Sequence, residues 1–432
     1  LLNTNDGTTT ATIYVVPTVI VDSVGDYWRI ALTANSGSTT NVRVVMYPNL
    51  NASGSLGAGE QVIWGAQLEE GSTATTYIPT TNLPSAAPRF DHDPTTGESL
   101  GLLVEESRTN LLTYSEEFDN SGAWSSLNFT VTANQAQAPD GTSTADKFLG
   151  LAGTSLKLVG QNTTNSGTYT YSVYVKSSTQ RYYQVSRSGN ATDYVNFDIQ
   201  ALQRSLYGVT TGSIQYVGNG WYRLIATFPS LSNSSMFLSY ADSLSFARQG
   251  STDSTNESFI WGAQLEVGSF PTSYIPTTGT ALTRSADVAS ITGSNFSSWY
   301  NQSEGTVLSD SDIIALGQTQ AVWQLAGGTY PTSLRQPNST GAKFRALIGG
   351  SLTPGTGVTL PGVTKAAVSF SGTAGRLQVG ASGVDTTTFG VLNPNALNIG
   401  TFTTGSQLNG TIARITYFPE RLPDSTLQAI TQ

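Results

Sequence analysis

An internal repeat constrains the fold of this chain more than any other feature. Ile63–Glu69 and Ile260–Glu266 both read Ile-Trp-Gly-Ala-Gln-Leu-Glu, and Thr76–Thr81 returns as Ser273–Thr278 with only its first residue changed. Both segments are displaced by 197 positions. Self-similarity at a fixed distance indicates that one structural module occurs twice.

The two copies differ in length upstream of this block. Val24–Ile30 corresponds to Val217–Leu224, and the displacement between Arg29 and Arg223 is 194 positions rather than 197. The second copy therefore has three more residues between the two conserved blocks. Length differences between duplicated domains fall in loops, so we expect a longer loop there.

The copies are also unequal in extent. We expect residues 109–288 to form a complete β-sandwich module and residues 1–85 to form only the C-terminal half of one. Half a sandwich cannot bury its strand faces alone, so this half must pair with other polypeptide. Because the chain starts Leu-Leu without Met, we expect it to be a fragment or a processed piece.

Alternating side chains predict β-strands through the complete copy. Tyr169–Val175 and Trp221–Phe228 alternate between two faces and are followed by Ser, Asn and Gly. In the repeated block we expect Trp to pack in a core, Gly to allow close backbone approach and Pro to end the strand. With 38% apolar residues and many Gly, the composition favours strands and turns. The predicted fold is all-β, with tandem antiparallel β-sandwich modules.

A further sandwich is predicted for residues 289–432. Strands alternate in Lys365–Phe370 and Leu408–Phe418 between turns rich in Gly, Thr and Ser. Residues 421–430 are typical of a short closing helix, with Asp424 or Ser425 expected as its N-cap.

Charge and residue usage exclude several function classes. The net charge of −9 is spread thinly and no Lys/Arg cluster occurs, which argues against a nucleic-acid or anionic-membrane partner. No apolar run approaches the roughly 20 residues needed to span a bilayer, so no membrane insertion is expected. The chain has no Cys and one His, which removes disulfides, thiolate metal sites and most imidazole catalysis.

Several motifs together resemble a known family. They are Asn110–Leu112, Ala138–Thr142, Gly220–Arg223, Trp261–Glu266 and the stretch Pro88–Leu112. They look like the jelly-roll modules of tailed-phage fibre and head-spike proteins, which are similar to galactose-binding-like domains and carbohydrate-binding modules. Residues 289–432 resemble a laminin-G-like or concanavalin-like sandwich.

The resemblance implies a structural virion protein without enzymatic activity. Its partners would be a host cell-surface glycan and other virion proteins, it would be a homotrimer, and it would sit on the virion surface. One alternative is a capsid decoration or fibre-shaft protein that binds no sugar. A second alternative is a polysaccharide depolymerase.

The most charged stretch, residues 86–108, is the natural place to look for catalysis. Its carboxylates are Asp91, Asp93, Glu98, Glu105 and Glu106, and two of them could flank a glycosidic bond. However, Asp-Pro-Thr-Thr-Gly is a turn sequence, and its flanks read as the two strands of a hairpin. We therefore expect a hairpin connector with no catalytic residue, and the lone His92 as a polar strand residue.

Glycan binding would need exposed aromatic rings. The candidates are Tyr182, Tyr183, Tyr194, Trp221, Trp299, Tyr300, Trp323 and Tyr330. Adjacent residues of a strand point to opposite faces, so one ring of the Tyr182–Tyr183 pair is expected outside. No cofactor is expected, although the resemblance allows a structural Ca²⁺, for which Glu116, Asp119 and Asp140 are the candidate ligands.

Overall fold

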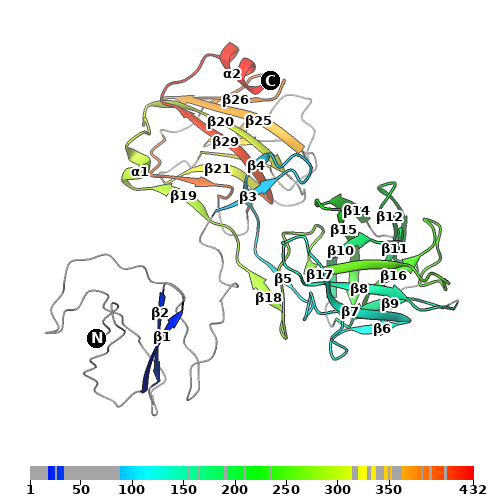
Figure 1. The fold of residues 1–432 in the computed structure, drawn as a ribbon. Coiled ribbons are helices and arrows are strands. Elements are labelled where there is room, and N and C mark those ends of the chain that lie inside the picture. The colour runs from blue at the N-terminus through cyan, green and yellow to red at the C-terminus, as the bar shows by residue number, and fades with distance from the viewer. Residues whose placement is uncertain are drawn as a thin grey trace. The chain divides into compact units, whose positions relative to one another are not determined.

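The structure is a computed structural model that describes residues 18–24, 27–33 and 88–432, the last range with gaps. The gaps are residues 154, 164–165, 189–191, 209–210, 233–234, 314–319, 328–331, 337–344, 349–350, 353–361, 382, 389–391 and 403–405. The described part is nearly all β, as the sequence predicts, and its strand pairs are antiparallel (Figure 1). None of its helices has the length and apolar character needed to cross a membrane.

The chain forms two compact units, Leu1–Leu83 and Pro84–Gln432. The first is described only at one hairpin, formed by β1 (Thr18–Val24) and β2 (Tyr27–Thr33). In the repeat this hairpin corresponds to β14 and β15 of the second unit, which also pair as neighbours. The rest of the predicted half-module lies outside the described residues.

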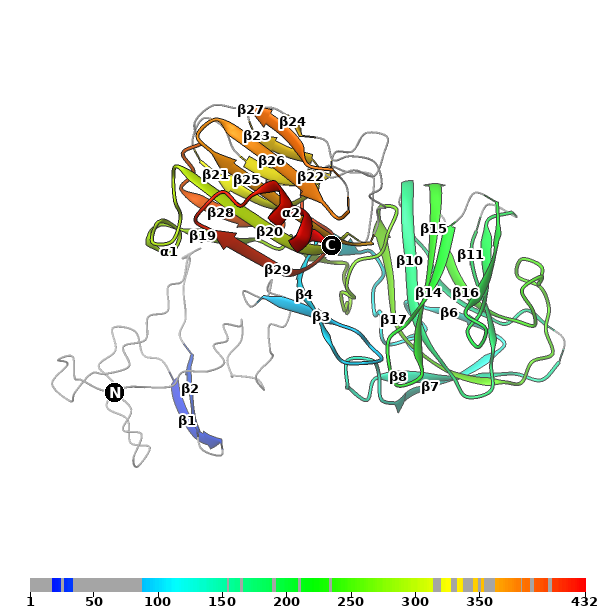
Figure 2. The same cartoon turned by 90° about the horizontal axis from the view of Figure 1, so that it is seen from above.

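The module at residues 109–288 consists of two six-stranded sheets, seen as separate layers in Figure 2. The β10 sheet runs in the order β14 (Thr211–Tyr216), β15 (Trp221–Ser232), β10 (Ser166–Ser177), β17 (Glu257–Val267), β8 (Ala145–Gly150) and β7 (Phe129–Ala136). The β11 sheet runs in the order β13 (Gln203–Tyr207), β12 (Tyr194–Asp198), β11 (Tyr182–Arg187), β16 (Met236–Ala241), β9 (Leu158–Gln161) and β6 (Ser125–Leu127).

One apolar core joins the two sheets face to face. It contains Tyr171 and Leu224 from the β10 sheet and Tyr183 and Val195 from the β11 sheet, all almost fully buried. These residues occupy alternate positions of their strands, so each strand turns one set of side chains inward. The other set faces outward, and we call that side the outer face of each sheet.

A strap, residues 268–278, covers the outer face of the β10 sheet. The Gln264 amide oxygen accepts the Ile275 N–H at 2.7 Å, and the Glu266 carboxylate accepts the N–H and the hydroxyl of Thr272. The Trp261 ring packs on Tyr274 with ring centroids 4.5 Å apart. The outward side chains of β17 therefore bind the strap that follows β17 in the chain.

These contacts give a physical reason for the repeat. In the Trp-Gly-Ala-Gln-Leu-Glu block, the Trp, Gln and Glu side chains contact the strap at its Tyr, Ile and Thr, respectively. A change in one block would break contacts with the other, so both blocks recur as a pair. The corresponding residues of the first copy lie outside the described residues; they are Trp64, Gln67, Glu69, Thr75 and Tyr77.

The C-terminal sandwich also has two sheets. The β21 sheet runs in the order β19 (Ala289–Thr292), β28 (Ala396–Ile399), β21 (Gln320–Ala326), β22 (Thr332–Gln336), β23 (Arg345–Ile348) and β24 (Ser351–Leu352). The β20 sheet runs in the order β27 (Asp385–Thr388), β26 (Ala374–Val379), β25 (Gly362–Ser371), β20 (Glu304–Ile313), β29 (Gly410–Phe418), β4 (Ser99–Val104) and β3 (Arg89–His92). The short helix α1 (Ser294–Ser297) follows β19.

The hairpin expected in residues 86–108 is present as β3 and β4, but it is more than a connector. Strand β4 pairs with β29, so the hairpin completes the β20 sheet of the C-terminal sandwich. The module at residues 109–288, which we call the jelly roll, is therefore inserted between two parts of the C-terminal sandwich. The chain enters it through β5 (Arg108–Asn110) and leaves it through β18 (Leu282–Arg284), which pair with each other as a two-stranded neck.

The closing helix α2 (Asp424–Thr431) forms where the sequence predicts a helix. Its N-cap is Pro423, so the expectation of Asp424 or Ser425 at that position is wrong. Asp424 instead starts the first turn, where a carboxylate is favoured by the helix dipole. The helix is anchored by Leu427, which is fully buried.

We predict that Gly101→Ala separates β4 from β29. Gly101 has a φ of +106°, and a Cβ there would overlap the backbone of Ile412. The change should lower the free energy of unfolding by about 2–4 kcal/mol, through backbone strain and steric overlap. Denaturant titration of the C-terminal sandwich measures this loss.

Gly97→Ala is the matched control. Gly97 also has a positive φ, +74°, but a Cβ there meets nothing within 4 Å. Its free energy of unfolding should fall only by the strain of placing Ala in the left-handed region, on the order of 1–2 kcal/mol. Equal losses for the two variants would contradict a close approach of β4 to β29.

Candidate functional site

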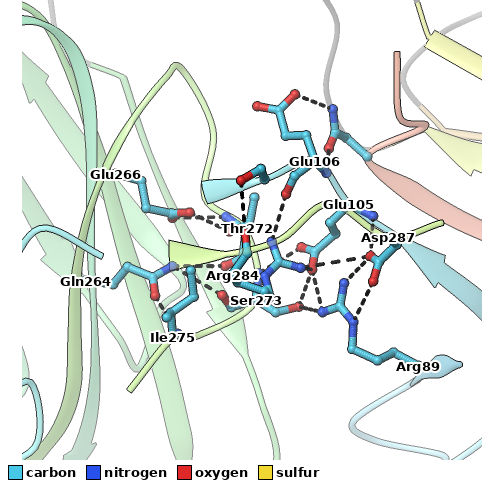
Figure 3. A network of polar contacts seen from close by, with 12 residues as sticks. Arg89, Glu105, Glu106, Gln264, Glu266, Thr272, Ser273, Ile275, Arg284 and Asp287 are labelled. Carbon is cyan, nitrogen blue, oxygen red and sulfur yellow. Dashed lines mark hydrogen bonds and ion pairs between the residues drawn. The ribbon is translucent and has the colours of Figure 1, made fainter. Parts of the chain in front are cut away.

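The charged stretch forms an ion network at the neck rather than an open cleft (Figure 3). The Glu105 carboxylate accepts hydrogen bonds from Arg89 at 2.7 Å and from Arg284 at 2.6 Å. It also accepts the N–H of Ser273 in the strap, at 2.8 Å. Asp287 accepts the Glu105 N–H at 2.7 Å and pairs with Arg89. One carboxylate therefore ties together the hairpin, the strap and the outgoing strand of the neck.

The next residue fixes the opposite side of the same junction. Glu106 forms an ion pair with Arg108 at 2.6 Å. Its N–H donates to the Asn409 side-chain oxygen at 2.9 Å, and the Asn409 amide donates back to the Glu106 carboxylate at 3.0 Å. Arg108 in turn lies over the Phe270 ring, 4.6 Å from its centroid.

Two of the other three carboxylates of the stretch, Asp91 and Asp93, also have local partners. Asp93 accepts the N–H groups of Thr95 and Thr96, which shapes the turn and lowers the pKa of Asp93. Asp91 accepts the N–H of His92, whose side chain is exposed on β3. These contacts support the structural interpretation of the stretch.

A different surface combines aromatic and amide side chains. On the outer face of the β11 sheet, strand register places Tyr207, Tyr194, Ser186, Phe237 and Gly160 side by side on five neighbouring strands. We call these residues the aromatic row. The Tyr194 and Tyr207 rings stack 4.2 Å apart at 10°, and a Cβ on the glycine would overlap the Phe237 ring. At about 4.8 Å per strand, the three rings span about 14 Å.

The three rings are each half-buried, so each retains solvent-accessible surface. Burial and the neighbouring Tyr207 raise the pKa of Tyr194, so the Tyr194 hydroxyl is uncharged at neutral pH. Aromatic rings suit the C–H faces of an uncharged ring compound. Here they lie on either side of Ser186, which is fully buried and accepts a 3.4 Å hydrogen bond from the Gln249 side chain.

Two buried amides lie beside the aromatic row on the same face. Gln184 donates to the Asn196 side-chain oxygen at 2.8 Å, two residue pairs along the strands from Ser186 and Tyr194. Both amides also bind the main chain of residues 242–250, which we call the cover loop. Their remaining polar atoms contact that loop and not the aromatic row.

Charged side chains in this part of the sheet occur in pairs. Arg181 binds Asp198 through two hydrogen bonds of 2.8 and 2.6 Å, and Arg187 binds Asp193 at 2.6 Å. The charges of these four side chains are thereby compensated, which favours a neutral partner over an ionic one at their positions.

The structure brings two of the eight predicted aromatics to this face. Tyr194 belongs to the aromatic row. Tyr182 lies farther along β11 on the same face, half-buried, with the Arg181 guanidinium 4.9 Å from its ring centroid. Tyr183 points the opposite way into the core, as expected for one member of an adjacent pair.

Four predicted glycan contacts need correction, because their rings are buried and used in packing. Tyr183 and Trp323 are fully buried, Trp221 is 1% exposed and donates its indole N–H to the Gln137 carbonyl, and Tyr300 is 8% exposed against Phe296. None of these rings offers a face to a ligand in this structure.

Two predicted aromatics remain in the C-terminal sandwich. Trp299 is half-buried, packs on Phe296 and Tyr417, and donates its indole N–H to the Asn295 carbonyl at 2.6 Å. Tyr330 lies outside the described residues.

The three predicted calcium ligands do not converge. Glu116 accepts a hydrogen bond from Tyr274 and lies near Asp140, whereas Asp119 lies near the buried Asp146. Within the described ranges, no group of three or more His, Cys, Asp or Glu side chains is placed to hold a metal ion.

Sequence reasoning missed Tyr207, Phe237 and the amide pair. The signal for Tyr207 was present, because a hairpin that pairs Asp198 with Gln203 necessarily sets Tyr194 opposite Tyr207. Phe237 joins the row through strand β16, whose position beside β11 cannot be read from local sequence.

Comparison with known proteins gives weak likenesses. No family model matches the chain, and no curated protein matches it. Among solved structures, the CBM40 module of a Ruminococcus gnavus IT-sialidase, bound to α2,3-sialyllactose, is 14% identical. It covers 34% of this chain and 93% of its own, with a TM-score of 0.28.

Laminin structures give similar values. The LG1-3 region of the laminin α2 chain is 10% identical, with a TM-score of 0.24, and covers 62% of this chain and 65% of its own. Domains LG4-5 of the mouse laminin α1 chain are 8% identical, with a TM-score of 0.22. The match covers 79% of this chain and 96% of the laminin chain. Likenesses at these values carry no argument about function.

We predict that acid weakens the neck through Glu105. Its pKa lies below the ordinary 4.5, because the attraction of Arg284 and Arg89 together with hydrogen bonds outweighs the large opposing effect of burial. A depressed pKa stabilises the folded state at neutral pH, and this contribution is lost as the pH falls below about 4.5 and through the folded-state value. Unfolding measured between pH 7 and pH 3 should show the loss.

Glu105→Gln tests the assignment. At pH 7 it should lower the free energy of unfolding by about 2–4 kcal/mol, since two arginines lose their shared carboxylate. The difference from the parent chain should shrink as the pH falls. The exposed Glu117→Gln is the control, expected within about 0.5 kcal/mol of the parent. A Glu105→Gln deficit that stays constant with pH would contradict the prediction.

Proposed function

We propose that this chain binds neutral cell-surface glycan through its jelly roll and does not chemically alter it. The observation that carries the proposal is the aromatic row on the β11 sheet, in which Tyr207 and Tyr194 stack and Phe237 lies two strands farther along, beyond Ser186. Sugar rings present C–H groups on one face, which pack against aromatic rings, and their hydroxyls need polar partners at the edge.

The setting we propose is the surface of a tailed-phage virion, where the chain is a fibre or head-spike subunit that attaches to host polysaccharide. This part rests on the motif resemblance described above. A shallow face binds one chain weakly, and a homotrimer displayed in several copies strengthens binding through multivalency. Mass measurement in solution tests the trimer, and labelling of intact virions tests the location.

Glycan binding is tested with the full chain on an array of bacterial surface polysaccharides. We expect selective binding to uncharged polysaccharides. Tyr194→Ala and Phe237→Ala should each weaken it about tenfold, since a lost ring contact costs on the order of 1–1.5 kcal/mol. Tyr216→Ala is the matched control, because Tyr216 is an exposed tyrosine, 38% accessible, on the other sheet.

Other outcomes favour the rival functions. No binding at high avidity would contradict the proposal and support a purely structural shaft or decoration protein. New reducing ends after incubation with host polysaccharide would support a depolymerase instead. Equal losses in all three variants would show that the aromatic row is not the site.

A further inference from the structure

The two outer faces of the jelly roll are covered in different ways. The strap on the β10 sheet has apolar anchors, because Tyr274 packs on Trp261 and Tyr174, and Ile275 is only 3% exposed. The cover loop on the β11 sheet has no such anchor. Its two large apolar residues, Leu244 and Phe246, are half-buried and belong to none of the core clusters of the described residues.

Hydrogen bonds from the sheet hold the cover loop instead. Gln184 donates to the Ala247 carbonyl at 3.0 Å and accepts the Gln249 N–H at 2.6 Å. Asn196 donates to the carbonyls of Leu244 at 3.1 Å and Phe246 at 2.7 Å. The sheet thus binds the loop mainly through its peptide groups, and such bonds exchange for other hydrogen bonds at small net cost.

The Tyr207 hydroxyl adds a link between the two parts of the site. It donates to the Leu244 carbonyl at 3.0 Å, while its ring stacks on Tyr194 in the aromatic row. A residue of the aromatic row therefore also holds the cover loop closed.

Two buried polar groups at this face and in the loop have no hydrogen-bond partner among the described residues. The Ser239 hydroxyl lies next to Gln184 in register, is 1% exposed, and has no hydrogen-bond partner among the described residues. The Nε of Arg248, in the loop itself, is also buried and unpaired within that part of the chain. Unsatisfied buried polar groups cost free energy, so the closed arrangement does not satisfy this face fully.

The loop has fixed ends. It starts after β16, and it is followed by Thr252, whose carbonyl accepts the ammonium group of the fully buried Lys157 at 2.6 Å. Thr252 also pairs with Ser155 through both main-chain groups. Movement of residues 242–250 therefore leaves both attachment points in place.

The loop also lies in the part of the repeat that varies. The three additional residues of the second copy fall between Arg223 and Ile260, a segment that contains the cover loop, whereas the strap has the same length in both copies and shares eight of its eleven residues. Variable loops on a constant scaffold are where binding specificity resides.

We propose that the cover loop occupies a second glycan subsite, formed by Gln184, Asn196 and Ser239, and that a glycan longer than the aromatic row displaces it. This inference rests on the proposed function. Sugar hydroxyls donate and accept hydrogen bonds as peptide groups do, so a neutral oligosaccharide replaces the loop's main chain at both amides and also reaches the unpaired serine.

Thiol labelling tests loop opening without ligand. Because the chain has no Cys, Ser239→Cys is the sole thiol of its variant and reacts only when the face is uncovered. Ser172→Cys, fully buried on the outer face of the β10 sheet, is the matched control under the strap. We expect Ser239→Cys to react at least tenfold faster than Ser172→Cys.

Adding Tyr207→Phe should raise the Ser239→Cys rate about threefold to tenfold, the effect of one lost hydrogen bond. Tyr169→Phe removes another tyrosine-to-carbonyl bond of the same module, from Tyr169 to Ser166, and should leave the rate unchanged. Labelling of Ser239→Cys no faster than the control, or insensitivity to Tyr207→Phe, overturns the loop opening.

Added glycan tests the replacement. The probes are isomaltohexaose, chitohexaose and the hexasaccharide of any polysaccharide bound on the array, each with its disaccharide. A bound hexasaccharide should slow labelling of Ser239→Cys while speeding hydrogen exchange of amides 244–250, and a disaccharide should do neither. Slower exchange of the loop with the hexasaccharide places the glycan over a closed loop and overturns the subsite. Absence of binding by any glycan defeats the proposed function and, with it, the subsite, even if the loop opens.

Discussion

Both sheets of the jelly roll bury polar side chains on their outer faces, and each buried group needs a hydrogen-bond partner that the chain itself must supply. On the β10 sheet, Gln264 and Glu266 receive the strap; on the β11 sheet, Gln184 and Asn196 receive the cover loop. The sandwich is thus four layers of chain in cross-section. A conventional sandwich with solvated outer faces would need no such covers.

The neck depends on a similar compensation of buried charge. Glu105 is nearly buried, and Arg89 and Arg284 approach it from two directions. Removing two charges from water is expensive, so such an arrangement persists only when several partners meet at one point. Here they meet where the strap of the jelly roll touches the hairpin of the C-terminal sandwich, through Ser273. The charged residues that suggest catalysis in the sequence therefore serve to connect two sandwiches, each with its own apolar core.

Local sequence predicts the strands well and their surroundings poorly. The alternation of Trp221–Phe228 predicts strand β15, and the turn Asp93–Gly97 predicts the hairpin of β3 and β4. Local patterns carry no information about pairing over some three hundred residues, so the union of β4 with β29 is invisible to them. The buried Trp221 shows a second limit. Period-two alternation assumes one solvent-exposed face, whereas Trp221 is covered on the outer face and its indole N–H binds the Gln137 carbonyl.

The incoming and outgoing strands of the jelly roll, β5 and β18, lie side by side as an antiparallel pair. A module whose two ends lie together in this way does not alter the path of the C-terminal sandwich. The chain leaves that sandwich after β4 and returns to it at β19 through one paired neck. The jelly roll and the C-terminal sandwich are therefore independent of each other in the path of the chain. One jelly roll could be exchanged for another with adjacent ends while the C-terminal sandwich keeps its strand order, its core and its attachments.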